Sequence, residues 1–555
     1  MKRNYNNIKI SAVKGIIILF TVLLVIPACQ DRLDEMNKNP NSLTEIPAEY
    51  IFTNAVRNTI DVSTGRIQAD FGAQHAHLAV SESWDRTTDA YEPGHLRGDV
   101  TQHVFKDIYR GGIKYALDVM LMTAPESDQA NEVQFALAKI VAIMNFSKLT
   151  DLFGDVPYFE AGLGKEGVFL PKYDSQELIY ADMVETLGTC LNILKSADFA
   201  DAFPGADPMY NNNKDKWLRF TNSFRLRLAM RARFADPAKY NPIIGECLSG
   251  DLIETNGSAM DRDNAAFQNA TLEHWDSEVG YLYNWWYSRY RDRVESKTYN
   301  FSVSELYVDR LRSTDDPRLE VLVEKATLDA DYIEWLNYNN DPRYEYVKDP
   351  ENAYMGMRNG LVMEQRDGTE TYTNNGKSVT IKLWPRKDIS YPSLAVWSRD
   401  QPMYFMTASE VWFLRAEAAL FGLGSGDANQ LYQMGVEQAM DLWGIDAADY
   451  LTNSSEGVLS GTDEEKFEQI STQMWVSFVP NYAEAWFNMR RTGYPKIAQR
   501  TTPDLSAGST DGYMPVRLRY PLTSERNING ENMQEAIDRM GGDDNIKTPV
   551  WWDVR

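Results

Sequence analysis

Apolar residues recur at helical spacing in two separate stretches of this 555-residue chain, about 46–236 and 404–491. An apolar side chain every three or four positions is typical of an amphipathic helix that packs against a core. Between these stretches, residues 237–400 are rich in Gly, Pro, Asn, Asp and aromatic residues, and they contain few periodic runs. The pattern therefore predicts a mainly α protein in which a long irregular region interrupts a helical scaffold.

The first stretch contains three well-defined helical runs, 128–149, 175–195 and 214–234. Asp174 with Glu177 forms a capping-box signature before the second run. The third run carries a row of arginines, which we interpret as salt-bridged helix faces in an acidic protein. The apolar face of the first run is Val133, Leu137, Ile140, Val141 and Met144, and that of the second is Ile179, Met183, Leu187, Cys190, Leu191 and Leu194. The apolar face of the third run is Trp217, Phe220, Phe224 and Leu228, and its arginines are Arg219, Arg225, Arg227, Arg231 and Arg233.

The second stretch predicts four helices at about 404–421, 427–443, 463–478 and 481–491. Thr407 with Glu410 is the capping-box signature of the first. Short turns between such helices favour antiparallel pairs, but no 34-residue repeat is visible, so the pattern alone supports helix pairs.

The irregular region gives weaker local signals. Residues 302–312 predict a helix, and residues 359–364 and 378–383 predict short strands. A stretch this long must hold further local structure, because structureless loops of such length are uncommon in compact domains.

The N-terminus has the composition of a bacterial secretory signal. Basic residues precede an apolar run at 15–26, which is too short to span a bilayer, since that needs about 20 apolar residues. Cys29 follows Pro27-Ala28 and resembles the cleavage site of lipoproteins, with Ile26 where Leu is more usual. The sequence predicts that residues 1–28 are removed, that Cys29 is acylated, and that the polar residues 29–45 form a tether. The alternative is an ordinary signal with a cysteine at the cut site by chance.

Charge and cysteine content exclude several classes of protein. The formal net charge is -24, whereas nucleic-acid binding requires clustered Lys and Arg, so we expect no nucleic-acid partner. The acidity also argues against a bare protein surface that sits on anionic lipid. Only Cys190 and Cys247 follow Cys29, which excludes a disulfide-dense scaffold. Because Cys190 lies on an apolar helical face, a buried free thiol is favoured over a disulfide between the two.

No motif in the chain predicts catalysis or a resident metal. Residues 162–167 match G-x-G-x-x-G, but Pro171 follows closely and no helix is expected to begin at Gly167, as dinucleotide binding would need. The histidines lack the spacing of a zinc site. A structural calcium ion is left open at the acidic turns 261–264 and 543–545, which lack EF-hand spacing. We expect no enzyme, no cofactor and no metal. A glycosidase carboxylate pair stays open as an alternative, because nothing singles out two of the 80 acidic residues.

Aromatic residues are the strongest candidates for ligand contacts. The chain holds 30 Tyr, 22 Phe and 14 Trp, and many of them lie where the helical pattern fails. Aromatic rings stack on the C–H faces of sugars while nearby polar side chains bond hydroxyl groups. The alternative for each ring is burial in a core. The candidate ligand-binding residues are Trp84, Tyr91, Trp275, Tyr283, Trp285, Trp286, Trp335 and Tyr338.

Several segments, in order along nearly the whole chain, resemble the SusD/RagB family of outer-membrane nutrient-binding lipoproteins, and most closely its SusD-like type 2 branch. They are 152–161 (Leu-Phe-Gly-Asp-Val-Pro-Tyr-Phe-Glu-Ala), 171–180, 216–227, the turn Asp315-Asp316-Pro317-Arg318-Leu319, 410–418, 486–495 and Arg519-Tyr520-Pro521. These motifs belong to the scaffold of the family, so they carry over no ligand contacts. The early loop with Trp84 is a candidate because such a loop commonly lines the family's site.

The resemblance implies a tetratricopeptide-like helix-pair scaffold with an irregular, aromatic-rich ligand-facing region and a few short strands. It implies one domain over residues 46–555, with 236–403 as the ligand-facing region. It also implies a lipoprotein on the outer membrane, facing the exterior, that binds oligosaccharides and delivers them to a SusC-like TonB-dependent barrel transporter. Two alternatives stay open: the same role with peptide cargo, and a hydrolase that acts on glycans. The identity of the sugar and its linkage are not encoded in any recognisable motif.

Overall fold

The computed structural model describes residues 46–81, 88–92, 100–200, 202–257, 270–272, 301–385, 388–396 and 402–555. Residues Ala48–Arg555 form one compact unit. The fold is mainly α, as predicted, and its strands occur as three short antiparallel pairs among the described residues. The domain boundaries drawn from the sequence stay a prediction.

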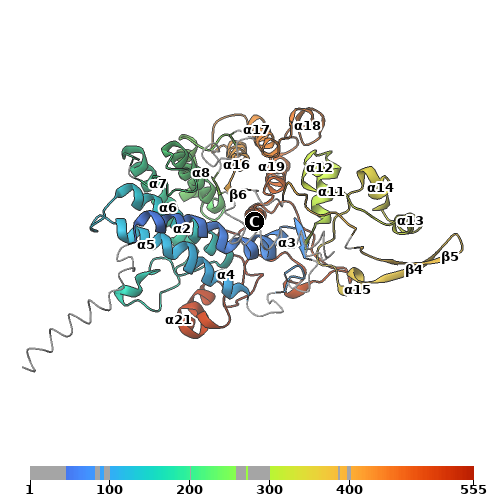
Figure 1. Cartoon of the computed structure of the whole chain (residues 1–555), viewed down its shortest axis with the longest axis horizontal. Helices are drawn as coiled ribbons and strands as arrows, with labels where there is room; N and C mark the ends of the chain where they lie inside the picture. Colours follow the sequence, from blue (N-terminus) through green and yellow to red (C-terminus); the bar gives the residue numbers. More distant parts are fainter. Residues whose placement is uncertain are drawn as a thin grey trace, which may run out of the picture. The chain divides into compact units, whose positions relative to one another are not determined.

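The N-terminal helices lie side by side (Figure 1). Helix α2 (Ala48–Ser63) runs on through a π-helical segment, Thr64–Gly72, into the short α3 (Ala73–His75). A second continuous rod is made of α4 (Val100–Ile108), the π-helical turn Tyr109–Ile113 and α5 (Lys114–Thr123). Both rods pack on α6 (Glu132–Phe153), which is almost entirely buried. The helical run predicted at 128–149 is therefore confirmed as the central helix of this region.

Helices α7 (Gln176–Ser196), α8 (Lys214–Ala232) and α9 (Pro237–Leu248) continue the scaffold, each packed on its neighbour in sequence. Helix α7 begins one residue later than its capping signature predicts: Ser175, not Asp174, accepts the hydrogen bond from the Leu178 N–H. Asp174 instead accepts hydrogen bonds from the N–H groups of Tyr158 and Phe159, which fixes the loop before it. Cys190 and Cys247 are both free and buried, as expected.

The C-terminal helices form the predicted pairs. They are α16 (Ala408–Leu420), α17 (Ala428–Asp441), α18 (Ala448–Asn453), α19 (Asp463–Ser477) and α20 (Tyr482–Thr492), followed by α21 (Ser524–Arg539). Helix α16 packs on α17 and α19, and α19 packs on α20. Thr407 caps α16 through the Glu410 N–H. The Glu410 carboxylate does not complete the capping box, because it turns into the core to bind Arg227.

The middle of the chain has a small apolar core of its own, formed by Val80 and by residues between Ala326 and Tyr391. We call residues 326–391 the irregular lobe. It contains α13 (Ala330–Tyr338), α14 (Tyr344–Val347), α15 (Met363–Arg366) and the hairpin of β4 (Thr369–Asn374) with β5 (Lys377–Lys382). Figure 1 shows this hairpin extending away from the helices beside it.

Three further sequence predictions concern the segments around this lobe. Residues 302–312 hold α11 (Glu305–Ser313), followed by α12 (Arg318–Leu322), and 378–383 holds β5, as expected. The strand predicted at 359–364 is wrong. Leu361 makes an isolated bridge to Leu505, and α15 begins at Met363.

The remaining strands join the middle of the chain to the scaffold. β1 (Ala79–Ser81) pairs with β3 (Phe301–Val303), with Val80 opposite Ser302. β2 (Ala270–Leu272) pairs with β6 (Met403–Met406) through an irregular register. Each pair therefore ties a segment of the irregular region to the end of a scaffold helix.

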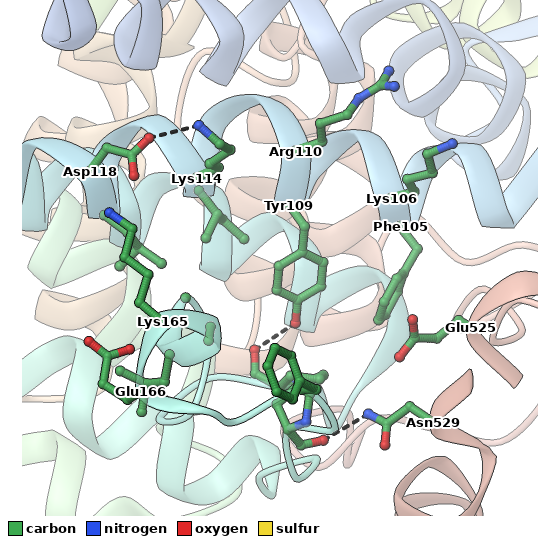
Figure 2. A pocket seen from close by; sticks show the side chains of 18 of the residues that line it. Phe105, Lys106, Tyr109, Arg110, Lys114, Asp118, Lys165, Glu166, Glu525 and Asn529 are labelled. Atoms are coloured by element: carbon green, nitrogen blue, oxygen red, sulfur yellow. Dashed lines mark hydrogen bonds and ion pairs between the residues drawn. The ribbon is translucent and has the colours of Figure 1, made fainter. Parts of the chain in front are cut away.

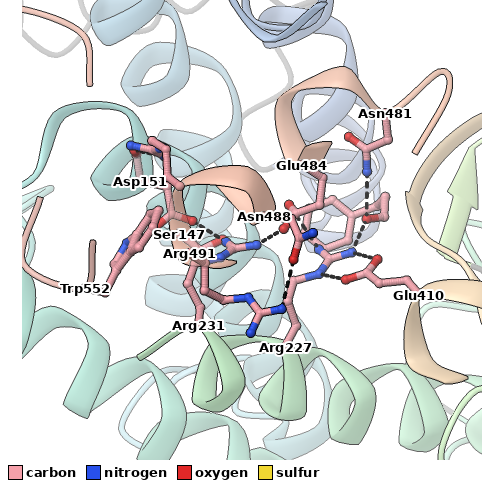
Figure 3. Close-up of polar contacts among 12 residues, drawn as sticks. Ser147, Asp151, Arg227, Arg231, Glu410, Asn481, Glu484, Asn488, Arg491 and Trp552 are labelled. Carbon is pink, nitrogen blue, oxygen red and sulfur yellow. Dashed lines mark hydrogen bonds and ion pairs between the residues drawn. The ribbon is translucent and has the colours of Figure 1, made fainter. Parts of the chain in front are cut away.

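Buried ion pairs cross the centre of the scaffold (Figure 3). Arg227 of α8 binds both carboxylate oxygens of Glu410 on α16, at 2.5 Å each. Arg231, one turn further along α8, pairs with Asp151 on α6 and with Glu484 on α20. The predicted salt-bridged arginine row is present, but these arginines lie inside the protein and join four helices instead of facing solvent.

Two further arginines, Arg233 and Arg491, share the buried Glu417 carboxylate. Burial alone would raise the pKa of Glu417, but the two guanidinium groups outweigh it and lower the pKa. Glu417 is therefore held as a charged group inside the scaffold. Paired and hydrogen-bonded in this way, an internal carboxylate does not incur the cost of an isolated buried charge.

Candidate functional site

Five of the candidate ligand-binding residues, Trp84, Trp275, Tyr283, Trp285 and Trp286, and the lipidation candidate Cys29 lie outside the described residues. The other three, Tyr91, Trp335 and Tyr338, have clear positions, and these differ widely in exposure. Only one of the three rings has an open face.

Tyr91 is fully buried at a junction of distant segments. Its hydroxyl lies 2.7 Å from His77 Nε2, and the Arg500 guanidinium covers its ring at 3.4 Å from the centroid. Its carbonyl accepts a hydrogen bond from the Ser509 N–H at 3.1 Å. Burial raises the pKa of Tyr91 to about 12, so its hydroxyl stays protonated at neutral pH. The ring is therefore part of the packing between His77 and Arg500, and it offers no surface to a ligand.

Trp335 and Tyr338 lie on the same helix, α13, with opposite exposure. Trp335 is buried in the core of the irregular lobe, next to Tyr332. Tyr338 is 68% exposed, and its ring packs against Tyr372 of the hairpin with centroids 5.7 Å apart. Tyr372 is held in turn, because its hydroxyl donates to the carbonyl of Asp331 at 2.8 Å.

The surroundings of Tyr338 suit a shallow polar ligand. The Asn374 amide and the Glu334 carboxylate are hydrogen-bonded to each other next to it. An exposed ring flanked by amide and carboxylate groups is an arrangement that can stack on a sugar face and bond its hydroxyl groups. Tyr338 is thus the described candidate whose position is compatible with direct contact.

The helical side of the unit holds a cavity that the sequence did not predict. It has a volume of about 900 Å³ and lies among the α4–α5 rod, the loop 157–171 and the start of α21. We call it the α5–α21 groove. Figure 2 shows Phe105 and Tyr109 projecting from the rod toward the α21 segment that carries Glu525 and Asn529. Its apolar walls include Ile113, Leu117, Met120, Phe135, Leu163 and Phe169.

Most polar groups of the α5–α21 groove already have partners within the protein. Tyr109 donates its hydroxyl proton to the carbonyl of Pro157 at 2.6 Å, and Asn529 donates to the carbonyl of Pro171 at 2.8 Å. Burial raises the pKa of Tyr109 well above its ordinary value, so this hydroxyl remains a donor. Glu525 accepts a hydrogen bond from the Tyr173 hydroxyl at 3.1 Å. The groove therefore presents mainly carbon to whatever enters it.

The sequence did contain a signal for the groove, in the G-x-G-x-x-G segment. Gly162 and Gly167 have φ of 85° and 90°, conformations that favour glycine. A Cβ on Gly162 would lie 2.8 Å from Leu117 Cδ1, so the segment approaches α5 closely. These glycines shape a wall of the groove, and the short turn between them, Leu163–Glu166, is not the long helix that dinucleotide binding requires.

No group of three or more His, Cys, Asp or Glu side chains within the described ranges could hold a metal ion. At the acidic turn 543–545, Asp544 binds Arg517 at 2.7 Å and Arg526 at 3.0 Å. The Asp544 carboxylate therefore stabilises the packing of the C-terminal segment through these two ion pairs. The turn 261–264 lies outside the described residues, and structural calcium stays a prediction.

Within the described part of the chain, one helix, α6, is long and apolar enough to cross a membrane, but 83% of its apolar window is buried inside the protein. The burial identifies it as the core helix already described.

Comparison with known proteins gives consistent matches. A family model for SusD-like proteins, described as starch-binding and associating with the outer membrane, matches residues 40–521. A solved structure named as a chitin-binding protein is 25% identical, with a TM-score of 0.70, over 91% of this chain and 99% of that one. A SusD homologue from Bacteroides uniformis is 25% identical, with a TM-score of 0.69, over 92% and 100% of the two chains.

A chitin-binding SusD homologue from Flavobacterium johnsoniae is 22% identical, with a TM-score of 0.69, over 92% of this chain and 99% of that one. At that identity the likeness concerns the fold. No curated protein matches the chain. These two matches cover 91% and 92% of this chain, so they extend beyond the helical scaffold into the irregular region.

Proposed function

The chain belongs to the SusD-like family, whose members are described as starch-binding and associating with the outer membrane. From this premise we propose that it is a cell-surface lipoprotein that binds nutrient oligosaccharides and passes them to a SusC-like TonB-dependent transporter. The same proposal assigns it no catalytic step. The observation that carries the oligosaccharide assignment is the alignment, over almost the full length of both chains, with a protein named as chitin-binding.

The lipid anchor follows from the N-terminal sequence. A basic start, a short apolar run and Cys29 together predict acylation at that cysteine. Metabolic labelling with palmitate tests this directly: we expect label on the native protein and none on Cys29→Ser. Protease treatment of intact cells tests the orientation, because a protein facing the exterior is digested without lysis.

The proposed binding mechanism uses rings and amide or carboxylate groups together. Aromatic rings stack on the C–H faces of sugar units, and polar side chains select among hydroxyl groups. Tyr338 with Asn374 and Glu334 is such a group in the described region, and Trp84, Trp275, Tyr283, Trp285 and Trp286 are proposed contacts elsewhere. Delivery requires release, so we expect dissociation constants between about micromolar and millimolar, or about -8 to -4 kcal/mol.

Calorimetry with chitin-derived and starch-derived oligosaccharides tests the proposal. We expect at least one series to bind, and we expect Trp285→Ala with Trp286→Ala to weaken binding by about tenfold or more without loss of helical circular dichroism. Tyr513→Ala is the matched control, because Tyr513 is an exposed ring outside the candidate set and its loss should change nothing. Unchanged binding in the double variant would remove that pair from the site.

Other outcomes separate the alternatives. Binding of peptides with no binding of any oligosaccharide would replace the sugar cargo by peptide. Release of new reducing ends from a polysaccharide would contradict a passive role. Copurification of a barrel transporter with the acylated protein from solubilised outer membranes is the expected result for the partner.

A further inference from the structure

We propose that Asn375, at the tip of the β4–β5 hairpin, is a site of spontaneous deamidation, in which its side-chain amide becomes a carboxylate. The reacting group is the protein's own Asn-Gly pair, and the co-reactant is water. The inference does not rest on the proposed function, because it concerns the chemistry of the chain itself. It follows from a comparison of the four Asn-Gly pairs in the sequence, which begin at Asn256, Asn359, Asn375 and Asn529.

The reaction needs a glycine nitrogen that can reach the side-chain Cγ of the asparagine before it. That nitrogen gives its proton to hydroxide and bonds to Cγ, and the Cγ–Nδ2 bond breaks as water returns a proton and ammonia leaves. Water then opens the cyclic imide on either side of the ring nitrogen, which gives aspartate or isoaspartate. An amide and a water molecule thus become a carboxylic acid and ammonia. Glycine favours the attack because it has no Cβ to hinder the approach.

The structure protects three of the four asparagines. Asn256, Asn359 and Asn529 are all buried, and each side-chain amide donates a hydrogen bond to the protein. Asn256 donates to the carbonyl of Gln438 at 2.7 Å, and Asn529 donates to the carbonyl of Pro171 at 2.8 Å. An amide held in this way cannot turn its Cγ toward the next nitrogen without breaking a buried hydrogen bond, which is costly.

Asn359 is held most firmly, because both reacting groups have partners. Its amide donates to Asp89 Oδ1 at 2.9 Å, and the N–H of Gly360 donates to the other oxygen of that carboxylate at 2.8 Å. The side-chain oxygen of Asn359 accepts from the Ser304 hydroxyl at 2.6 Å. A Cβ on Gly360 would lie 2.5 Å from the guanidinium of Arg500, so the segment is also closely packed.

Asn375 differs from the other three in each of these respects. It is exposed, and the side-chain hydrogen bond at this turn belongs to its neighbour Asn374, which donates to Glu334. Among the described residues, neither the Asn375 side chain nor the N–H of Gly376 has a hydrogen-bond partner. A Cβ on Gly376 would meet no atom within 4 Å, so water can reach the pair from outside.

The position of the turn also allows it to rearrange. The cyclic imide constrains rotation between Asn375 and Gly376, so the left-handed turn has to open before the ring can close. Figure 1 shows the hairpin extending away from the helices beside it. The tip of such a hairpin opens at a much lower free energy than a helix core, because two strands alone are marginally stable.

The isoaspartate product would loosen the end of the hairpin. It lengthens the main chain by one carbon atom, because the chain then runs through the former side chain. Only residues 375–376 join Asn374 to its partner Lys377, so the extra atom disturbs the register of this closing pair. Asn374 also bonds to Glu334, and we expect this bond to be weakened as well.

The test is incubation of the purified mature protein at mildly alkaline pH, followed by peptide mapping and by enzymatic methylation of isoaspartate. The mass change from amide to carboxylic acid identifies each converted residue. We expect Asn375 to convert at least about tenfold faster than Asn256, Asn359 and Asn529 in the native protein. In concentrated urea the four should convert at similar rates, because a glycine follows each of them and the native contacts are lost.

Asn375→Gln is the matched variant, because its longer side chain closes the ring far less readily. It should remove conversion at the turn and leave the other three asparagines unchanged. Equal rates at the four asparagines of the native protein would overturn the proposal. So would an Asn375 that stays intact in the native protein but converts in urea.

Hydrogen exchange tests the effect on the hairpin. Freshly purified Asn375→Asp carries the new charge without the extra carbon atom, so it separates the two consequences of the reaction. We expect faster amide exchange over residues 369–382 in the isoaspartate form than in Asn375→Asp. Equal exchange in the two forms would overturn the expected loosening.

Discussion

The helical scaffold and the irregular lobe are stabilised by different kinds of interior. The scaffold combines long apolar helix faces with internal ion pairs, such as Arg227 with Glu410 and Arg231 with Asp151. The lobe has a smaller core of aromatic and apolar residues, including Trp335, on short helices and one hairpin. The difference shows that the scaffold depends on partners far apart in sequence, whereas the lobe is built mainly from residues within about 60 positions of each other.

Breaking an internal ion pair should have the largest effect. Arg227→Met leaves the Glu410 carboxylate buried without its bidentate partner, and we expect a loss of about 3–5 kcal/mol in the free energy of unfolding. Urea denaturation followed by circular dichroism measures it. Arg110→Met, on the π-helical turn after α4, removes a pair with Asp107 from an arginine that is 68% exposed, and it should cost about 1 kcal/mol or less. Equal losses in the two variants would contradict an energetic role for the internal network.

The lobe is tested by truncating its central ring. Trp335→Ala should remove about 3 kcal/mol or more of stability, because it leaves a cavity in a small core. Hydrogen exchange should show lost protection within 326–391 and little change in α6, if the lobe opens as a unit. Tyr338→Ala, on the same helix but exposed, should change stability by about 0.5 kcal/mol or less. Loss of protection throughout the chain in Trp335→Ala would show that the two regions unfold together.

Buried histidine makes the junction of the two regions sensitive to acid. Burial, with the charges of Arg500 and Arg490, lowers the pKa of His75 from 6.5 to about 3. Below pH 6.5, His75 therefore binds a proton in the unfolded chain but not in the folded chain. The free energy of unfolding is highest above pH 6.5 and falls as the pH drops. When the pH falls from 7.5 to 5.5, we expect the free energy of unfolding of the native protein to decrease by about 1.4 kcal/mol more than that of His75→Gln.

Denaturant titrations at the two pH values measure this difference. A His75→Gln variant with an unchanged pH dependence would show that His75 is not the group responsible.

The smallest effect is expected at the hairpin turn. Asn375 and Gly376 have φ of 49° and 80°, the left-handed pair that joins two strands tightly. Gly376→Val should cost about 1 kcal/mol locally, because a β-branched residue is strained there. Amide exchange in 369–382 should rise while the midpoint of global unfolding stays nearly constant. A large shift of that midpoint would mean that the hairpin is an integral part of the lobe core.

The scaffold could be predicted closely from the sequence because its helices repeat apolar residues at a fixed spacing. The boundaries of α6, α7, α16, α17, α19 and α20 follow those faces within a few residues. The burial of Arg227 and Arg231 could not be predicted, since their carboxylate partners lie on α6, α16 and α20, and spacing along one helix does not reveal such partners. Glu410 is an example. The local sequence predicts that its carboxylate completes a capping box, but in the structure the carboxylate points into the core and binds Arg227.

The irregular lobe and the sites were less predictable. Residues 359–364 hold the apolar run Leu361-Val362-Met363, which suggests a strand, but a turn at 359–360 and the start of α15 at Met363 leave no room for one. Tyr91, Trp335 and Tyr338 are all aromatic residues in aperiodic sequence, yet only Tyr338 is exposed, because exposure depends on which distant segments cover each ring. The α5–α21 groove was missed for the same reason, because its walls combine residues 102–171 with the start of α21, about 350 positions further along the chain.

Helix α8 and the following Arg233 take their carboxylate partners from both directions along the chain, with Asp151 before them and Glu410, Glu417 and Glu484 after them. A ribosome-bound or prematurely terminated chain that stops before α16 would hold three guanidinium groups with most of their counter-ions missing. The interior of such a fragment would hold unpaired charge, so we expect residues 48–248 expressed alone to be much less stable than the same helices in the whole chain.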